Sequence, residues 1–253
     1  MANLEIKNIT KKYGKKIVLN DVNFKVKQGE FLSILGPSGC GKTTLLKILI
    51  GIEKATTGCV FKDGKEITYV DPSLRGMGMV FQNYALFPNM SVLENVSYVL
   101  NLKLRDKVKS KEEALKMLKI VNMEEHINKH PHELSGGQQQ RVAIARTLAL
   151  KPDVILFDEP MSALDADNRL GLRKKLKEIQ KKFKTTMIYI THDQEEAFSL
   201  SDRVMVMRDG KIEQIDTPNK IYNFPVNEYV KKFVTNHLKE KVSSIEKCTG
   251  IDL

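Results

Sequence analysis

Apolar and polar residues alternate near the start of the chain, across residues 4–26, with glycines at the turns. Alternation with this period predicts antiparallel strands that have one buried face. Residues 31–35 are almost all apolar and predict a buried strand, which runs into a glycine-rich loop and then into a helix over residues 42–50. Two more strands are predicted at residues 59–62 and 78–82.

Helical spacing of the apolar residues replaces the strand pattern between about residues 83 and 133. Apolar positions three and four residues apart predict one helix over residues 92–104 and another over residues 111–121. Strand patterns come before and after this segment, and the next buried strand is predicted at residues 154–157. We therefore expect a helical subdomain that is inserted into a sheet.

The rest of the chain alternates between helices and strands. An amphipathic helix is predicted over residues 168–183 and a strand over residues 187–190. A last strand is predicted at residues 211–214, with helices within residues 218–237. Strands that alternate with helices predict a parallel sheet covered by helices on both faces.

The predicted fold class is therefore α/β, with a P-loop core built on a parallel sheet. We expect one domain over residues 1–237, which includes an N-terminal antiparallel β subdomain and the helical subdomain at about residues 83–133. Residues 238–253 are expected to form a polar tail that is frayed beyond Lys239.

Composition adds few limits on function. With 253 residues, 42% of them hydrophobic, the chain is long enough for one substantial core. Its most apolar segment, residues 45–52, is too short to span a membrane, and its N-terminus lacks the pattern of a signal peptide, so a cytoplasmic protein is expected. The three cysteines form no metal-type cluster in the sequence and are expected to stay reduced.

The net charge of +10 would suit a polyanion, but the lysines are scattered along predicted helices and turns. A solvated lysine-rich surface is therefore favoured over a nucleic-acid site. The sequence contains no zinc finger, helix-turn-helix or aromatic RNA-binding motif, and no nucleic-acid partner is expected.

The glycine-rich loop after residues 31–35 has the spacing GxxxxGK[ST]. Its glycines allow backbone N–H groups to wrap the β- and γ-phosphates of a nucleotide, Lys42 adds a positive charge, and the Thr43 hydroxyl can bind Mg²⁺. The strand before the loop and the helix after it are the context that this motif requires. The nucleotide-binding residues expected in this loop are Gly36, Pro37, Ser38, Gly39, Cys40, Gly41, Lys42, Thr43 and Thr44.

Further candidate residues lie at the ends of predicted strands. Asp158 and Glu159 are adjacent and point in different directions, so Asp158 is expected to hold Mg²⁺ and Glu159 to act as the base on the attacking water. Gln82 can contact the metal or the water and report γ-phosphate occupancy to the helical subdomain, and His192 can reach the γ-phosphate. Tyr13 offers an aromatic face to adenine. Each has a structural alternative, such as a turn residue, an exposed loop carboxylate or an ordinary hairpin tyrosine.

A second glycine-rich turn consists of Ser135, Gly136, Gly137 and Gln138, and it opens a helix predicted over about residues 138–150. Ser135 is expected to cap this helix, whose N-terminus offers N–H groups and a positive dipole end to an anion. One nucleotide needs one phosphate-binding loop, whereas the chain has two candidate phosphate-binding turns. We therefore expect a homodimer in which this turn contacts the ATP that is bound by the partner molecule.

Together these motifs resemble the nucleotide-binding subunit of an ATP-binding cassette (ABC) transporter. Six features occur in the order typical of that family: the loop at 36–43, Gln82, residues 134–138, residues 154–159, residues 162–165 and His192. The resemblance implies that Tyr13 stacks on adenine and that His192 is the switch histidine. It also implies that Ser135 and Gly137 contact the γ-phosphate of the opposite subunit's ATP.

Two segments, residues 79–88 and 191–197, resemble importers for polyamines, iron, sulfate, phosphonates and oligosaccharides. The resemblance implies ATP-powered import at the cytoplasmic face of the membrane, with an extracellular solute-binding protein. Two transmembrane permease subunits are expected to dock near residues 82–90 and the helical subdomain. A phosphonate or a polyamine is the expected cargo. Many members of this branch carry a further small β-barrel domain, which is not expected here because the chain ends soon after Pro225.

A soluble ABC-type ATPase that acts on ribosomes or DNA is the alternative function, and the positive charge is its main support. Such proteins generally fuse two cassettes or insert a long coiled coil. This sequence has one set of motifs, with about fifty residues between Gln82 and Leu134. A simple P-loop kinase would leave the second glycine turn unexplained, so transport is the favoured prediction.

Overall fold

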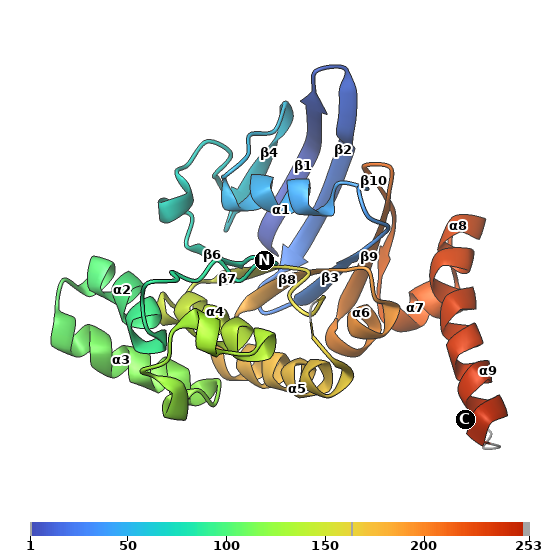
Figure 1. Ribbon diagram of the computed structural model, residues 1–253. Coiled ribbons are helices and arrows are strands. Elements are labelled where there is room, and N and C mark those ends of the chain that lie inside the picture. The colour runs from blue at the N-terminus through green and yellow to red at the C-terminus, as the bar shows by residue number, and fades with distance from the viewer. Residues whose placement is uncertain (1, 163, 250–253) are drawn as a thin grey trace. The chain divides into compact units, whose positions relative to one another are not determined.

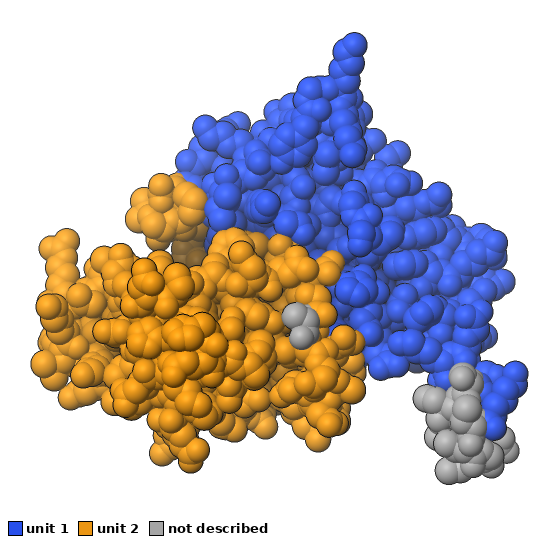
Figure 2. Space-filling view, in the orientation of Figure 1, with its two compact units in different colours: residues 1–70, 188–253 blue, residues 71–187 orange. Residues whose placement is uncertain are grey.

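The computed structural model describes residues 2–162 and 164–249, which divide into two compact units (Figure 2). The described part of unit 1 comprises residues 2–70 and 188–249, and that of unit 2 comprises residues 71–162 and 164–187. The single domain expected over residues 1–237 stays a prediction.

Unit 1 begins with an antiparallel sheet of strand order β2-β1-β4-β5 (Figure 1). Its strands are β1 (Ala2–Tyr13), β2 (Lys16–Lys27), β4 (Thr57–Lys62) and β5 (Lys65–Glu66). β1 and β2 form a long hairpin, with Tyr13 opposite Lys16 at its closed end. Alternate side chains of β2, at Val22, Phe24 and Val26, are buried as in a sheet with one covered face. The predicted antiparallel strands are therefore confirmed.

In the second sheet, the strands of unit 1 follow the order β10-β9-β3-β8. These strands are β3 (Phe31–Leu35), β8 (Thr186–Thr191), β9 (Arg203–Arg208) and β10 (Lys211–Asp216), and residues 188–191 of β8 belong to unit 1. β3 and β9 are parallel, whereas β9 and β10 are antiparallel. Every residue of β3 and β8 is buried, as expected for parallel strands covered on both faces.

The helices of unit 1 are α1 (Lys42–Ile50), α6 (Gln194–Leu200), α7 (Pro218–Asn223), α8 (Glu228–Val230), the π-helical η4 (Lys231–Asn236) and α9 (His237–Thr249). Apolar residues of β3, β9 and the helices α6 to η4 form one buried cluster, which includes Leu35, Val206 and Val234. The frayed tail predicted beyond Lys239 is wrong as far as Thr249. These residues continue α9, and their lysines and glutamates favour helix.

Unit 2 contains two parallel strands, β6 (Met77–Val80) and β7 (Val154–Asp158). Its helices are α2 (Val92–Leu104), α3 (Lys107–Ile120), α4 (Gly136–Ala149) and α5 (Ala166–Phe183), with short 3-10 helices η1 (Pro72–Leu74), η2 (Glu124–His126) and η3 (Pro131–Glu133). α2, α3 and α4 pack on one another (Figure 1). All regular structure between residues 83 and 133 is helical, as predicted.

In the part of the chain that the structure describes, none of the helices is both long and apolar enough to cross a bilayer.

Candidate functional site

The glycine-rich loop, or P-loop, joins β3 to α1 in unit 1. Lys42 is the first residue of α1 and is only 4% exposed. Its ammonium group donates hydrogen bonds to the carbonyl oxygens of Gly36, at 2.8 Å, and of Pro37, at 3.0 Å. The charge of Lys42 therefore lies inside the curve of the loop, where a bound phosphate would receive it.

The glycines of the P-loop are required by its shape. The backbone of Gly41 is left-handed, with φ 104°, and a Cβ atom there would lie 2.8 Å from the carbonyl oxygen of Val18. A Cβ atom on Gly36 would lie 2.5 Å from the carbonyl oxygen of Met207. With no side chains at these positions, the loop can curl tightly and turn its N–H groups toward an anion. This geometry fits the phosphates of a nucleotide at the N-terminus of α1.

The other predicted residues of the P-loop differ in exposure. Pro37, Ser38 and Gly39 are exposed at the tip, whereas Thr43 and Thr44 are half-buried in the first turn of α1. The Cys40 side chain is 4% exposed. Burial raises the pKa of the Cys40 thiol, although the charge of Lys42 opposes this effect. The thiol is therefore neutral at pH 7, and Cys40 can contribute to the loop through its backbone.

Two more predicted residues lie in unit 1, at strand ends. Tyr13 ends β1 and is 47% exposed. His192 is exposed and follows β8 directly. The hydroxyl groups of Tyr189 and Thr191 each donate a hydrogen bond of 2.8 Å to Glu196 Oε2. This buried carboxylate fixes the carboxyl end of β8, where His192 begins the loop.

In unit 2, Asp158 and Glu159 are placed as predicted. Asp158 is the last residue of β7 and is 7% exposed. Glu159 has a left-handed backbone with φ 45° and precedes Pro160, an unfavourable conformation for a residue before proline. The regular strand therefore ends between the two carboxylate residues. Backbone strain of this kind clusters at functional sites, which supports separate roles for them.

Gln82 lies next to the turn that follows β7. Its Nε2 atom is 3.5 Å from the hydroxyl of Ser162, and that hydroxyl donates a hydrogen bond of 3.0 Å to the carbonyl oxygen of Glu159. Ser162 therefore connects Gln82 to the backbone of Glu159. The fold brings these residues together across 80 positions in the sequence.

The second glycine turn caps α4. Ser135 Oγ accepts a hydrogen bond from the N–H of Gln138 at 3.3 Å, and Gln138 Oε1 accepts one from the N–H of Ser135 at 2.9 Å. This capping box confirms Ser135 as the cap, although α4 begins at Gly136, two residues before the predicted start. The N–H groups of Gly136 and Gly137 are outside the capping box and lie at the positive end of the helix dipole. They are suited to bind an anion.

The same turn packs on other candidate segments of unit 2. A Cβ atom on Gly136 would lie 3.5 Å from the hydroxyl of Tyr84, and one on Gly137 would lie 3.5 Å from the side chains of Leu164 and Asn168. The turn therefore lies against both the loop that follows Gln82 and the segment that follows Glu159.

Arg146 of α4 binds the loop after Gln82. Its Nη1 donates to the carbonyl oxygen of Ala85 at 2.8 Å and its Nη2 to that of Tyr84 at 3.1 Å. Tyr84 and Ala85 both have left-handed backbones, with φ 60° and 48°. The guanidinium group also lies 5.4 Å from the centroid of the Phe87 ring. The helix that begins with the second glycine turn thus holds this loop in an uncommon conformation.

The predicted Mg²⁺ ligands are Thr43 in unit 1 and Gln82 and Asp158 in unit 2. Hydroxyl, amide and carboxylate oxygens are hard donors, and this set suits Mg²⁺. Within residues 2–162 and 164–249, no group of three or more His, Cys, Asp and Glu side chains is arranged to hold a metal. A metal site made only of those four residue types is therefore not indicated for the described chain.

Residues 19–162, more than half of the chain, match the family model described as ABC transporter. The chain belongs to the ABC transporter family. This ABC protein is 46% identical to an Fe(3+) ions import ATP-binding protein of Fusobacterium nucleatum over 252 residues, which are 98% of this chain and 68% of the relative. It is 49% identical to a spermidine/putrescine import ATP-binding protein of Clostridium novyi over 231 residues, 91% of this chain and 67% of the relative. The chain thus spans about two thirds of the length of these relatives.

Two solved structures of an ABC cassette are similar to this ABC protein. A dimeric bacterial ABC transporter cassette has a TM-score of 0.78 and 37% identity, and a dimeric post-hydrolysis state bound to ADP and Pi has a TM-score of 0.77 and 37% identity. Each match covers 85% of this chain and 98% of the solved chain. The predicted family and the predicted α/β fold class are confirmed, and the chain carries an ABC ATPase domain.

The candidate residues lie in loops, at strand ends and in the first turns of α1 and α4. Gln82 is two residues beyond β6, which ends at Val80 rather than at the predicted residue 82. The individual roles of these residues stay predictions. Ser162 and Arg146 were missed as site residues. Ser162 lies within a segment that resembles the family, and a hydroxyl three residues after Glu159 was the available signal. Arg146 had no such signal, because its partners Tyr84 and Ala85 are about sixty residues away.

Proposed function

We propose that this ABC ATPase domain hydrolyses ATP to power solute import through separate transmembrane subunits, at the cytoplasmic face of the membrane. The observation that carries the proposal is the P-loop, whose curve holds the ammonium group of Lys42 and has no room for side chains at Gly36 and Gly41. Family membership and the names of the import ATP-binding relatives support the coupling of ATP to import.

The proposed roles follow from the chemistry of each residue. The P-loop residues from Gly36 to Thr44 bind the phosphates, Tyr13 stacks on adenine, and Glu159 accepts the proton of the attacking water. Asp158, Gln82 and the Thr43 hydroxyl are the residues that would hold Mg²⁺. When bound, that ion would offset negative charge on the β- and γ-phosphates.

We assign the remaining contacts of the γ-phosphate to His192 and to a second copy of the chain. Ser135, Gly136, Gly137 and Gln138 of that copy would complete each site. The exposed Ser135 and the N–H groups of Gly136 and Gly137 suit this role, because they lie at the start of a capped helix. The dimeric state of the solved cassettes is further support. The ATP-bound dimer is therefore the catalytic unit in this proposal.

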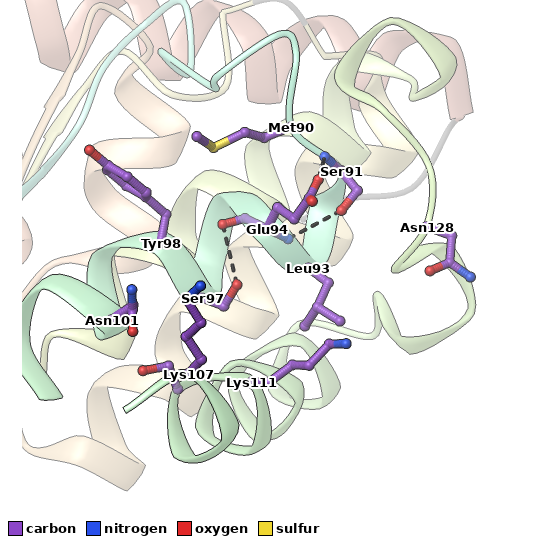
Figure 3. A pocket seen from close by; sticks show the side chains of 11 residues that line it. Met90, Ser91, Leu93, Glu94, Ser97, Tyr98, Asn101, Lys107, Lys111 and Asn128 are labelled. Carbon is purple, nitrogen blue, oxygen red and sulfur yellow. Dashed lines mark hydrogen bonds between the residues drawn. The ribbon is translucent and has the colours of Figure 1, made fainter. Parts of the chain in front are cut away.

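The permease subunits are proposed to dock on the helical segment of unit 2. An open cavity of about 520 Å³ lies there, and side chains of α2 and α3 line it, among them Tyr98, Lys107 and Lys111 (Figure 3). The Tyr98 ring packs edge-on against Phe87, with ring centroids 5.2 Å apart. Since Arg146 holds the backbone just before Phe87, a contact at this cavity would connect to the loop that follows Gln82.

The ATP-bound dimer is tested by sedimentation. Glu159→Gln should bind ATP, turn over about 10²- to 10⁴-fold more slowly, and accumulate as a dimer. Adding Ser135→Arg should keep ATP binding but abolish the dimer, because a long charged side chain would occupy the shared surface. Ser199→Arg, at an exposed serine of α6, is the matched control and should leave the dimer intact. Turnover of Glu159→Gln at the wild-type rate, or a dimer that survives Ser135→Arg, would refute these assignments.

The import function is tested with the membrane partners. Co-purification with two integral membrane subunits, and ATP-dependent uptake of a solute by vesicles that contain the complex, are the expected results. Tyr98→Arg should reduce co-purification while ATP-dependent dimerisation of the isolated protein persists. Stimulation of ATP hydrolysis by ribosomes or RNA, with no membrane partner, would instead support the soluble alternative. A polyamine or phosphonate cargo stays a prediction.

A further inference from the structure

Tyr13 is held by two charged side chains that the proposed function does not use. The hydroxyl of Tyr13 donates a hydrogen bond of 2.9 Å to Glu53 Oε2. The other carboxylate oxygen, Oε1, accepts one of 2.7 Å from the ammonium group of Lys11. That ammonium group also lies 4.6 Å from the centroid of the Tyr13 ring and donates to the carbonyl oxygen of Lys54 at 2.8 Å. The three side chains therefore contact one another directly.

Burial and charge favour this arrangement. The Lys11 side chain is 11% exposed and the Glu53 side chain 30%, so the ion pair is partly shielded from water, whereas Tyr13 is 47% exposed. The hydrogen bond from Lys11 and then that from Tyr13 lower the pKa of Glu53, and the bond to Glu53 raises the pKa of Tyr13. At neutral pH the glutamate is thus charged and the phenol keeps the proton that it donates.

Glu53 also connects the cluster to the P-loop helix. Its backbone N–H donates to the carbonyl oxygen of Lys47 in the last turn of α1, at 3.1 Å. The same helix begins at Lys42, directly after the P-loop. Tyr13, at the end of β1, is therefore joined through one carboxylate to the helix whose first residues are proposed to bind the phosphates.

We infer that Lys11 and Glu53 are positioning residues that fix the Tyr13 ring as the platform for the adenine base, at a set distance from the phosphate-binding end of α1. The inference rests on the proposed binding of ATP. Lys11 covers one face of the ring, so the base stacks on the opposite face. The Lys11 ammonium group on one face of the ring and the hydrogen bond from its hydroxyl to Glu53 restrict the motion of the ring before the base binds. Stacking of the base then costs less conformational entropy.

The test distinguishes the contribution of the base to ATP binding from that of the phosphates. Calorimetry on the full chain gives the dissociation constants of ATP and of tripolyphosphate, which has phosphates but no base. Glu53→Ala should weaken ATP binding about threefold to tenfold and leave tripolyphosphate binding unchanged. A loss of this size is part of the binding free energy that stacking on an aromatic ring contributes for one base. Tyr13→Phe, which keeps the ring but removes the hydroxyl, should have a similar effect. In the double variant the two losses should not add, because both remove the same hydrogen bond.

Two further variants complete the test. Glu53→Gln keeps an oxygen that can accept the bond from Tyr13 and should recover part of the ATP affinity. Glu5→Ala removes another ion pair of the same sheet, the 2.7 Å contact with Lys25, and should change neither dissociation constant. A Glu53→Ala variant that binds ATP like the wild type, or that loses ATP and tripolyphosphate equally, overturns the inference. A wild-type protein that does not bind ATP overturns the proposed function itself.

Discussion

Gly39 and Gly41 are two residues apart in the P-loop, and both have left-handed backbones, with φ 80° and 104°. Their surroundings differ. A Cβ atom on Gly39 would meet nothing within 4 Å, whereas one on Gly41 would lie 2.7 Å from Leu19 Cδ2 and 2.8 Å from the carbonyl oxygen of Val18. The leucine side chain can rotate, but the carbonyl belongs to β2 and moves only with its strand. Gly41→Ala should therefore be more damaging than Gly39→Ala.

The structure gives the size of each effect. A left-handed backbone costs an alanine about 1–2 kcal/mol, and Gly39→Ala should lower the free energy of unfolding by that amount. Gly41→Ala adds the overlap with β2, which at about 1–3 kcal/mol brings the total loss to about 2–5 kcal/mol. Gly64→Ala is the matched control, because Gly64 lies in the turn between β4 and β5 with φ 79° and also has nothing within 4 Å.

Urea unfolding followed by circular dichroism measures the stabilities, and calorimetry measures ATP binding. Gly64→Ala and Gly39→Ala should lose equal stability, but only Gly39→Ala should weaken ATP binding, because its methyl group stands at the exposed tip of the phosphate loop. Equal unfolding free energies for Gly39→Ala and Gly41→Ala would show that β2 does not constrain the loop. ATP affinity unchanged in Gly39→Ala would contradict the assignment of this tip to the phosphates.

Two further predictions concern Cys40 and Arg146. In a variant whose only thiol is Cys40, iodoacetamide should react at pH 8 about tenfold more slowly than with the same protein in urea, because burial raises the thiol pKa and keeps the thiolate fraction low. The rate should increase as the pH rises above about 8.5, the usual thiol pKa, and equal folded and unfolded rates would refute the raised value. Arg146→Gln should lower the free energy of unfolding by about 1.5–3 kcal/mol for each of the two charged hydrogen bonds that is lost, and it should speed amide exchange at residues 84–88. Arg146→Lys, which keeps the charge but not the paired geometry, should lose less, and unchanged exchange in Arg146→Gln would show that the loop keeps its conformation without this contact.

Helix limits were predictable where the sequence carries its own end signals. α1 and α2 have the predicted bounds, because a glycine follows the apolar run of α1 and a Ser91–Glu94 capping box begins α2. α3 begins at Lys107, four residues before the predicted start. Its first turn is lysine-rich and mostly exposed, so apolar spacing could not show it, although Asp106 caps it. The strand β9 was not predicted, since a short apolar run does not by itself distinguish strand from helix.

The candidate site shows the same division between local and long-range information. The P-loop, the Asp158–Glu159 pair and the second glycine turn are local patterns whose chemistry follows from adjacent residues. The contact of Tyr13 with Glu53 spans 40 positions in the sequence, and that of Gln82 with Ser162 spans 80. Such contacts depend on how strands and helices pack, and one sequence carries no local pattern for them. The residues that position the site are therefore the ones that motifs miss.

The loop after Gln82 is held by one such residue, Arg146. Two consecutive left-handed residues, Tyr84 and Ala85, together cost about 2–4 kcal/mol relative to ordinary backbone. The two hydrogen bonds from Arg146 to their carbonyl oxygens together contribute about 3–6 kcal/mol, since bonds to a charged donor are worth about 1.5–3 kcal/mol each. The hydrogen bonds therefore outweigh the backbone strain by about 1–2 kcal/mol, so a change of that size at Gln82 or at the start of α4 would be enough to release the loop from this conformation. Under the proposed function, a phosphate contact at either end would then alter Phe87 and the cavity beside Tyr98, without a large change in the helices.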